Sequence, residues 1–139
     1  MLLTLVGCGS ASRPISYTDL TLRVGALEFT SITVALFHDR VKLLYVLERN
    51  NPGRPIRLPP LDFSRQEVFL VSTGPRSSTG YALRIVKIRD VGDHIVVVVH
   101  ERTPTLGETG VRARVTYPFR LIALPRADET VHLKWPGRP

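Results

Sequence analysis

Apolar and polar residues alternate with a period of two along most of the chain, which is the pattern of strands that bury one face. Segments with this pattern, or with an apolar run of strand length, predict strands at 20–25, 32–37, 41–47, 67–72, 80–88, 95–99, 111–117, 119–124 and 131–135. Leucine and alanine leave a helical alternative open over 31–48, but the β-branched and aromatic residues there favour strands. We expect no helix elsewhere in the chain.

Three of these strands carry more specific expectations. Within 80–88 the alternation shifts near Val86, which predicts a β-bulge. The segment 95–99 is apolar at every position, so we expect a central strand that is buried on both faces. The segment 111–117 has the most regular alternation, with two arginines opposite its apolar residues.

Turns and proline-rich loops separate the predicted strands. The clusters at 50–53 and 90–93 are typical of turns, and the prolines within 55–60 predict an extended loop that no central strand could tolerate. Short strands at such regular spacing predict an all-β fold, either an antiparallel β-sandwich or a small open barrel of about eight or nine strands. We expect one domain over 19–139, preceded by a tether within 1–18.

The chain is basic, with a formal net charge of +7 and a sequence pI near 10.3. An arginine-rich surface can bind phosphates, anionic lipid headgroups or acidic proteins. Genomic base composition acting on exposed positions would explain the same excess without any partner. Charge therefore points to classes of partner and says nothing about the fold.

The only cysteine, Cys8, excludes an internal disulfide and a CxxC metal or redox motif. Residues 1–7 are apolar and uncharged, and Leu5-Val6-Gly7-Cys8 resembles the lipobox of bacterial lipoproteins. That resemblance implies a lipid anchor on Cys8 and a place in the bacterial cell envelope, lipid-anchored or secreted. The apolar run is shorter than a usual signal core and has no basic start, so a cytoplasmic protein with an apolar N-terminus is the alternative.

Four arginines form a candidate basic sheet face. Arg112 and Arg114 share one side of a predicted strand, and Arg84 and Arg89 can lie on a neighbouring strand. Such a face could bind an anionic polymer or nucleic acid, whereas its alternative role is a solvated face that protects an edge strand. The tyrosines fall on the opposite, apolar side, where they cannot stack on bases, and this argues against nucleic acid.

The sequence offers no catalytic or metal-binding motif. Its four histidines are scattered singly, and the aspartates at 90 and 93 fall in a predicted turn, where aspartate commonly bonds the backbone. There is no GxSxG, phosphate-binding loop or GxGxxG segment. We therefore expect no enzyme activity, no cofactor and no bound metal.

The loop over 73–81 is the candidate partner-binding site. Its glycine, serine and threonine residues can offer hydroxyl and backbone donors, with one arginine as a charged contact. Gly80 is expected to adopt a positive φ or to permit a close backbone approach, which is also compatible with a purely structural role. The residues predicted to bind a partner are Arg76, Ser77, Ser78, Thr79, Gly80 and Tyr81.

From residue 61 to residue 125 the order of motifs resembles the C-terminal domain of the PrcB family, the protease complex subunit proteins. The matching motifs are Asp62-Phe63-Ser64, the apolar strand 68–74, Ser78-Thr79-Gly80-Tyr81, the valine-rich strand 95–99 and Thr116-Tyr117-Pro118. Thr79 stands where the family has its first glycine. The resemblance implies an envelope protein that binds a protease and stabilises or restrains it.

A weaker similarity links the same loop to chagasin-like protease inhibitors, which use a Thr-Thr-Gly-Tyr loop against the protease cleft. Ser78-Thr79-Gly80-Tyr81 is similar, but the preceding Asn-Pro and the following Trp are missing. This resemblance therefore implies a loop that contacts another protein, and inhibitory activity does not follow from it.

Overall fold

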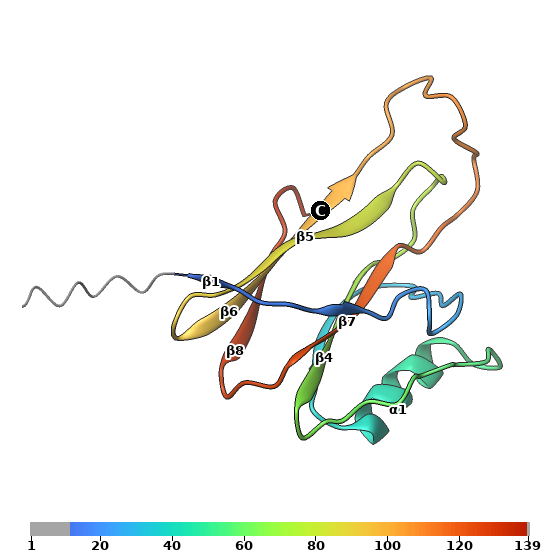
Figure 1. The fold of residues 1–139 in the computed structure, drawn as a ribbon. Coiled ribbons are helices and arrows are strands. Elements are labelled where there is room, and N and C mark those ends of the chain that lie inside the picture. The colour runs from blue at the N-terminus through green and yellow to red at the C-terminus, as the bar shows by residue number, and fades with distance from the viewer. Residues whose placement is uncertain (1–11, 139) are drawn as a thin grey trace, which may run out of the picture.

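The protein is a two-sheet β-sandwich with one helix packed on its second sheet (Figure 1). The computed structural model describes residues 12–138, so Cys8, the predicted lipidation site, lies outside the described residues. The elements in chain order are β1 (Arg13–Pro14), β2 (Thr18–Asp19), β3 (Ile32–Phe37), α1 (Arg40–Asn50), β4 (Gln66–Thr73), β5 (Ala82–Asp90), β6 (His94–Arg102), β7 (Phe119–Pro125) and β8 (Thr130–Lys134).

Each sheet has four strands. We call the sheet with strand order β1-β5-β6-β8 sheet A, and the sheet with order β2-β7-β4-β3 sheet B. All neighbouring strands are antiparallel except β6 and β8, which run parallel. The predicted all-β fold is therefore confirmed as a sandwich, and the two sheets do not form a closed barrel.

Sheet B is the middle layer of the molecule, and this explains why its central strands are buried on both faces. Phe69 and Ile122 belong to the core between the two sheets. Val68, Leu70 and Leu121 belong to a second core beneath the helix. Successive residues of a strand point to opposite faces, so strand β4 supplies both cores along one continuous apolar run.

The segment predicted as the strand 41–47 is helix α1, and the open helical alternative is the correct one there. Asp39 has extended backbone geometry and its side chain accepts a hydrogen bond from the Lys42 amide at 2.8 Å, which caps the helix. Leu43 and Leu47 lie one turn apart and are fully buried against sheet B. Tertiary packing on this one face outweighs the strand preference of the valines and tyrosine.

The bulge predicted in β5 is confirmed, whereas the predicted burial of β6 on both faces is not. The β5–β6 register shifts between Ile85 and Lys87, which places the bulge at Val86 as predicted. Strand β6 lies between β5 and β8, yet only its inward residues are buried, and Val96 and Val98 on the other face are half-buried. The strand is central as expected, but the second face of sheet A has no covering layer within residues 12–138 (Figure 1).

Two further strand predictions are wrong. Residues 21–24 form turns, and Leu20 and Val24 are both buried in the core beneath the helix. Residues 111–117 form an irregular loop whose only ladder contact among the described residues is the bridge from Thr116 to Arg76. Strand pairing begins nearer the N-terminus than the sequence pattern indicates, because β1 pairs with β5 and β2 pairs with β7.

Within residues 12–138, no helix is long and apolar enough to cross a membrane.

Candidate functional site

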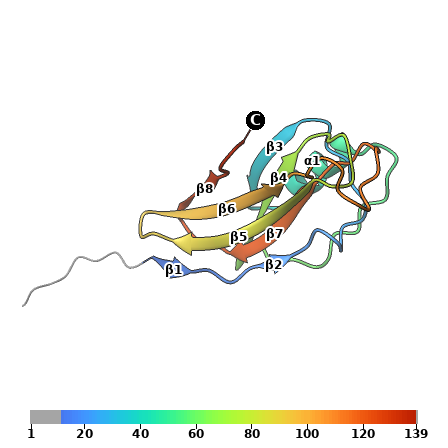
Figure 2. The same ribbon diagram turned by 90° about the horizontal axis from the view of Figure 1, so that it is seen from above.

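Two of the loops that carry the chain between the sheets lie at the same end of the sandwich (Figure 1 and Figure 2). The loop 74–81 connects β4 of sheet B to β5 of sheet A, and the loop 103–118 returns the chain from β6 to β7. We call these two loops together the loop platform. Because each crosses in the opposite direction, their backbones run antiparallel and can bond to one another.

Hydrogen bonds join the two loops along their length. The amide of Arg76 donates to the carbonyl of Thr116 at 2.8 Å, and the amide of Thr116 donates back at 2.9 Å. The amide of Thr79 donates to the carbonyl of Arg112 at 3.1 Å, while the Arg112 amide donates to the Thr79 hydroxyl at 2.9 Å. The Thr116 hydroxyl adds a bond to the carbonyl of Ser78 at 2.8 Å. The predicted binding loop is therefore held by its neighbour rather than projecting alone.

Arg76 braces the base of the platform. Its guanidinium forms a bidentate ion pair with Glu101, with Nε–Oε1 at 2.5 Å and Nη2–Oε2 at 2.9 Å. These side chains are only 16% and 9% exposed. The hydrogen bond to Glu101 raises the pKa of Arg76 above its ordinary value, so the charge is permanent. The guanidinium is engaged inside the protein, and the predicted partner contact by Arg76 stays a prediction.

Gly80 permits a close approach of the two loops and does not adopt a positive φ. A Cβ at this position would lie 2.5 Å from Cβ of Pro104, far inside van der Waals contact. The carbonyl of Gly80 accepts a hydrogen bond from Arg102 at 2.7 Å, which ties the loop to the end of β6. Tyr81 follows with its ring half-buried and the Arg76 guanidinium 6.0 Å from the ring centroid.

The outer surface of the platform contains a hollow of about 690 Å³. Ser77 and Ser78 line one side of it, and residues of the longer loop line the other. Leu106 lies on the rim and is fully exposed, between a threonine and Gly107, which has a φ of +75°. The sequence prediction included the two serines and missed Leu106, whose only sequence signal was an isolated leucine inside a loop rich in glycine, proline and threonine.

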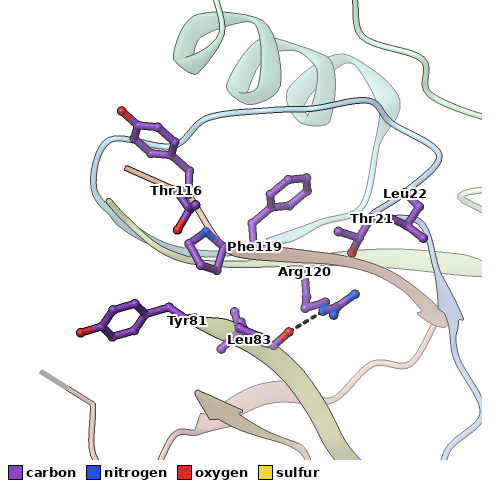
Figure 3. A pocket seen from close by; sticks show the side chains of 10 residues that line it. Thr21, Leu22, Tyr81, Leu83, Thr116, Phe119 and Arg120 are labelled. Atoms are coloured by element: carbon purple, nitrogen blue, oxygen red, sulfur yellow. Dashed lines mark hydrogen bonds between the residues drawn. The ribbon is translucent and has the colours of Figure 1, made fainter. Parts of the chain in front are cut away.

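A second hollow, of about 310 Å³, lies beside the loop platform, between the start of β5 and the start of β7 (Figure 3). Tyr81 and Leu83 line one wall, and Phe119 and Arg120 line the other. Arg120 donates to the carbonyl of Leu83 at 2.6 Å and to Asp19 at 3.1 Å, which joins the two sheets across the hollow. This guanidinium is thus also a structural brace.

The four arginines of the predicted basic face do not lie together. Arg84 and Arg89 are on β5, with Arg84 exposed and Arg89 half-buried through its hydrogen bonds to Ser12. Arg112 and Arg114 are exposed in the loop platform and not on a neighbouring strand. The basic face is therefore divided, because the regular alternation at 111–117 does not form a strand.

The structure also shows a buried carboxylate that the sequence pattern did not indicate. Glu67 is fully buried in β4, and its Oε2 lies 2.8 Å from Nε2 of His38, whose side chain is 49% exposed. Within residues 12–138 the other carboxylate oxygen, Oε1, has no hydrogen-bond partner. In the same part of the chain, no three His, Cys, Asp or Glu side chains are gathered to hold a metal ion.

The family model described as PrcB C-terminal matches residues 68–125. This match covers less than half of the chain, and over these residues it supports the resemblance to the PrcB family. No curated protein and no solved structure matches the chain.

The PrcB C-terminal segment corresponds to a coherent part of the fold. It spans β4 to β7 together with both crossing loops, so it contains the central strands of both sheets and the whole platform. Helix α1, β3 and β8 lie outside the match and complete the sheets and the second core. The family resemblance predicted from the motif order is confirmed, and it includes every residue of the candidate partner-binding loop.

Proposed function

We propose that this protein is a non-catalytic module of the bacterial cell envelope that binds a protease and stabilises or restrains it. The match to the PrcB C-terminal family fits a protease-associated module. The binding surface is the loop platform, with Ser77 and Ser78 on one side of its hollow and Leu106 on its rim. A lipid on Cys8 would hold the module at the membrane.

The observation that carries this proposal is the hydrogen bonding between the two loops. A loop that is already ordered loses little conformational entropy when a partner binds, so more of the contact energy appears as affinity. The main-chain bonds of Arg76 and Thr79 to the longer loop fix the shape of the hollow before any partner arrives. A fully exposed leucine beside such a hollow is suited to be the apolar anchor of a protein contact.

The residues of the predicted site thus have different roles under this proposal. Ser77, Ser78 and Leu106 contact the partner, because they line the hollow. Thr79 and Gly80 shape the surface through their bonds and close packing with the longer loop. Arg76 and Tyr81 support the platform from beneath.

Site-specific photo-crosslinking in intact cells tests the proposal. A photoreactive residue replaces Leu106 or Ser77, and the matched control carries it at Val41, which is 78% exposed on the helix. We expect a crosslinked protease from the platform positions and none from the helix. Crosslinking of the same proteins from all three positions, or the absence of any protease among the platform products, would overturn the proposal.

A further inference from the structure

The outer face of sheet A is cationic and partly apolar, and the proposed function does not use it. We call this surface the valine face. It consists of outward side chains of β5, β6 and β8, namely Arg84, Val86, Lys87, Arg89, His94, Val96, Val98, His100, His132 and Lys134. The outward residues at the strand ends, Ala82, Arg102 and Thr130, lie at its border, where Arg102 pairs with Glu108. It lies opposite the core between the sheets, on the side away from α1 (Figure 1).

Cations border a strip of valines on this face. Across the sheet, Val98 pairs with Lys87 on one side and with Lys134 on the other. Val96 pairs with Arg89 and with His132 in the same way. Strands lie about 4.8 Å apart, so the two rows of basic side chains are separated by roughly 10 Å with the valines between them.

The cations of the valine face have few acidic partners within residues 12–138. Arg84, Lys87 and Lys134 are exposed and form none of the ion pairs found there. No outward position of the three strands is an aspartate or glutamate. Asp90 and Glu101 are next to residues of this face in the sequence but occupy inward positions of their strands, and Asp93, in the turn before β6, contacts His94 at 2.5 Å.

The bulge adds an apolar projection among these cations. Val86 is the extra residue of β5 and is 47% exposed, with Arg84 and Lys87 on either side of it. Exposed apolar side chains among cations match the interface of an anionic bilayer, which offers negative headgroups and the edge of the acyl region together. A purely polyanionic chain would use the cations and gain nothing from the valines. The face carries no Phe, Tyr or Trp ring on which a base or sugar could stack, and its His94 and His132 rings stack on each other.

We propose that the valine face binds an anionic lipid bilayer, so that sheet A lies against the membrane and the loop platform is presented at its side. The contact is reversible and electrostatic, with Arg84, Lys87 and Lys134 facing the headgroups and Val86 entering the interface. It is independent of any lipid on Cys8 and of the protease proposal.

Vesicle sedimentation with the full, unlipidated chain tests this inference. We expect at least tenfold stronger partitioning into phosphatidylcholine vesicles containing about 30% phosphatidylglycerol than into phosphatidylcholine alone, with a steep loss in high salt. The combined variant Arg84→Gln, Lys87→Gln and Lys134→Gln should lose most of that preference. A matched control, Arg23→Gln with Arg57→Gln and Arg112→Gln, removes three exposed charges elsewhere and should retain most of it.

Val86→Ser separates a bilayer from other anionic partners, because it keeps every charge. We expect it to weaken vesicle partitioning several-fold while leaving retention on a heparin column unchanged. The inference is wrong if the control and face variants lose vesicle binding equally. It is also wrong if wild type binds heparin or DNA but does not distinguish the two vesicle types. Circular dichroism confirms that each variant is folded before its binding is compared.

Discussion

Arg76 and Glu101 form a bidentate ion pair that joins the first crossing loop to strand β6 beneath the platform, with contacts of 2.5 and 2.9 Å. The same guanidinium donates to the carbonyl of Thr73 at 3.1 Å, so it also holds the end of β4. One side chain therefore connects the end of β4 in sheet B to β6 in sheet A. The position of the loop platform depends on this link.

We expect Arg76→Ala to destabilise the protein by about 2 kcal/mol, because it leaves Glu101 poorly solvated and without its partner. Urea denaturation measures the change in the free energy of unfolding. A double-mutant cycle with Glu101→Gln isolates the pair, and its coupling should exceed about 1 kcal/mol. Arg84→Ala is the matched control at an exposed arginine. Equal losses from Arg76→Ala and Arg84→Ala would show that the pair does not brace the platform.

Gly80→Ala tests the close packing of the two loops. The added methyl would meet Pro104, so one loop has to move, and we expect a loss of roughly 1–3 kcal/mol. Hydrogen exchange should be faster at the amides of Thr79 and Arg112, which bond between the loops. Ser77→Ala, at an exposed neighbouring position, should change neither measurement. Unchanged exchange in Gly80→Ala would contradict the packing described for the platform.

The strands of the central part of the fold could be predicted because local preference and burial agree there. Strand β4 is a continuous run of apolar and β-branched residues that both cores require. The bulge at Val86 was visible because the shift in alternation is itself the sequence mark of an extra residue. In these segments tertiary packing and the local sequence pattern favour the same strand.

The failed predictions lie where tertiary contacts decide the structure. Helix α1 has two valines and a tyrosine that favour a strand, and its signals are the Asp39 cap and the one-turn spacing of Leu43 and Leu47. The segment 111–117 alternates regularly, but its residues find a backbone partner mainly in Arg76 and Thr79, so no ladder forms. The serines of the hollow were predicted, whereas Leu106 was not, because exposure in a loop leaves no periodic signal.

The His38–Glu67 pair gives a third prediction. His38→Ala removes the only described hydrogen-bond partner of a fully buried carboxylate, and we expect it to cost about 1–3 kcal/mol. His38→Ala should destabilise the Glu67→Gln variant less than it destabilises wild type, because an uncharged amide without a partner is less costly to bury than a carboxylate. Chemical denaturation of the two single variants and the double variant measures this coupling. Strictly additive losses would mean that the two side chains do not interact.

Glu129 provides a prediction of pH dependence. Burial raises the pKa of Glu129 above its ordinary value, and so does the neighbouring Asp90 carboxylate, which accepts a hydrogen bond from the protonated Glu129. A carboxyl whose pKa is raised on folding stabilises the folded state below its unfolded pKa, and that stabilisation is lost as pH rises through the folded value. Wild type should therefore lose stability relative to Glu129→Gln as pH rises through the weakly acidic range.

Thermal denaturation of wild type and Glu129→Gln from about pH 4 to pH 7 measures this difference. Glu129→Gln should become more stable relative to wild type as the pH rises towards neutrality. Asp128→Asn changes an exposed neighbouring carboxyl and serves as the control. A difference that stays constant across this range would contradict the raised pKa of Glu129.

The most direct test of the proposed function is the affinity of this protein for the protease identified by crosslinking, measured by calorimetry with wild type and Leu106→Asp. A charge placed at the apolar rim of the hollow should weaken binding at least tenfold, while Val41→Asp on the helix should bind as wild type does. An unchanged affinity in folded Leu106→Asp would show that the loop platform is not the surface that holds the protease.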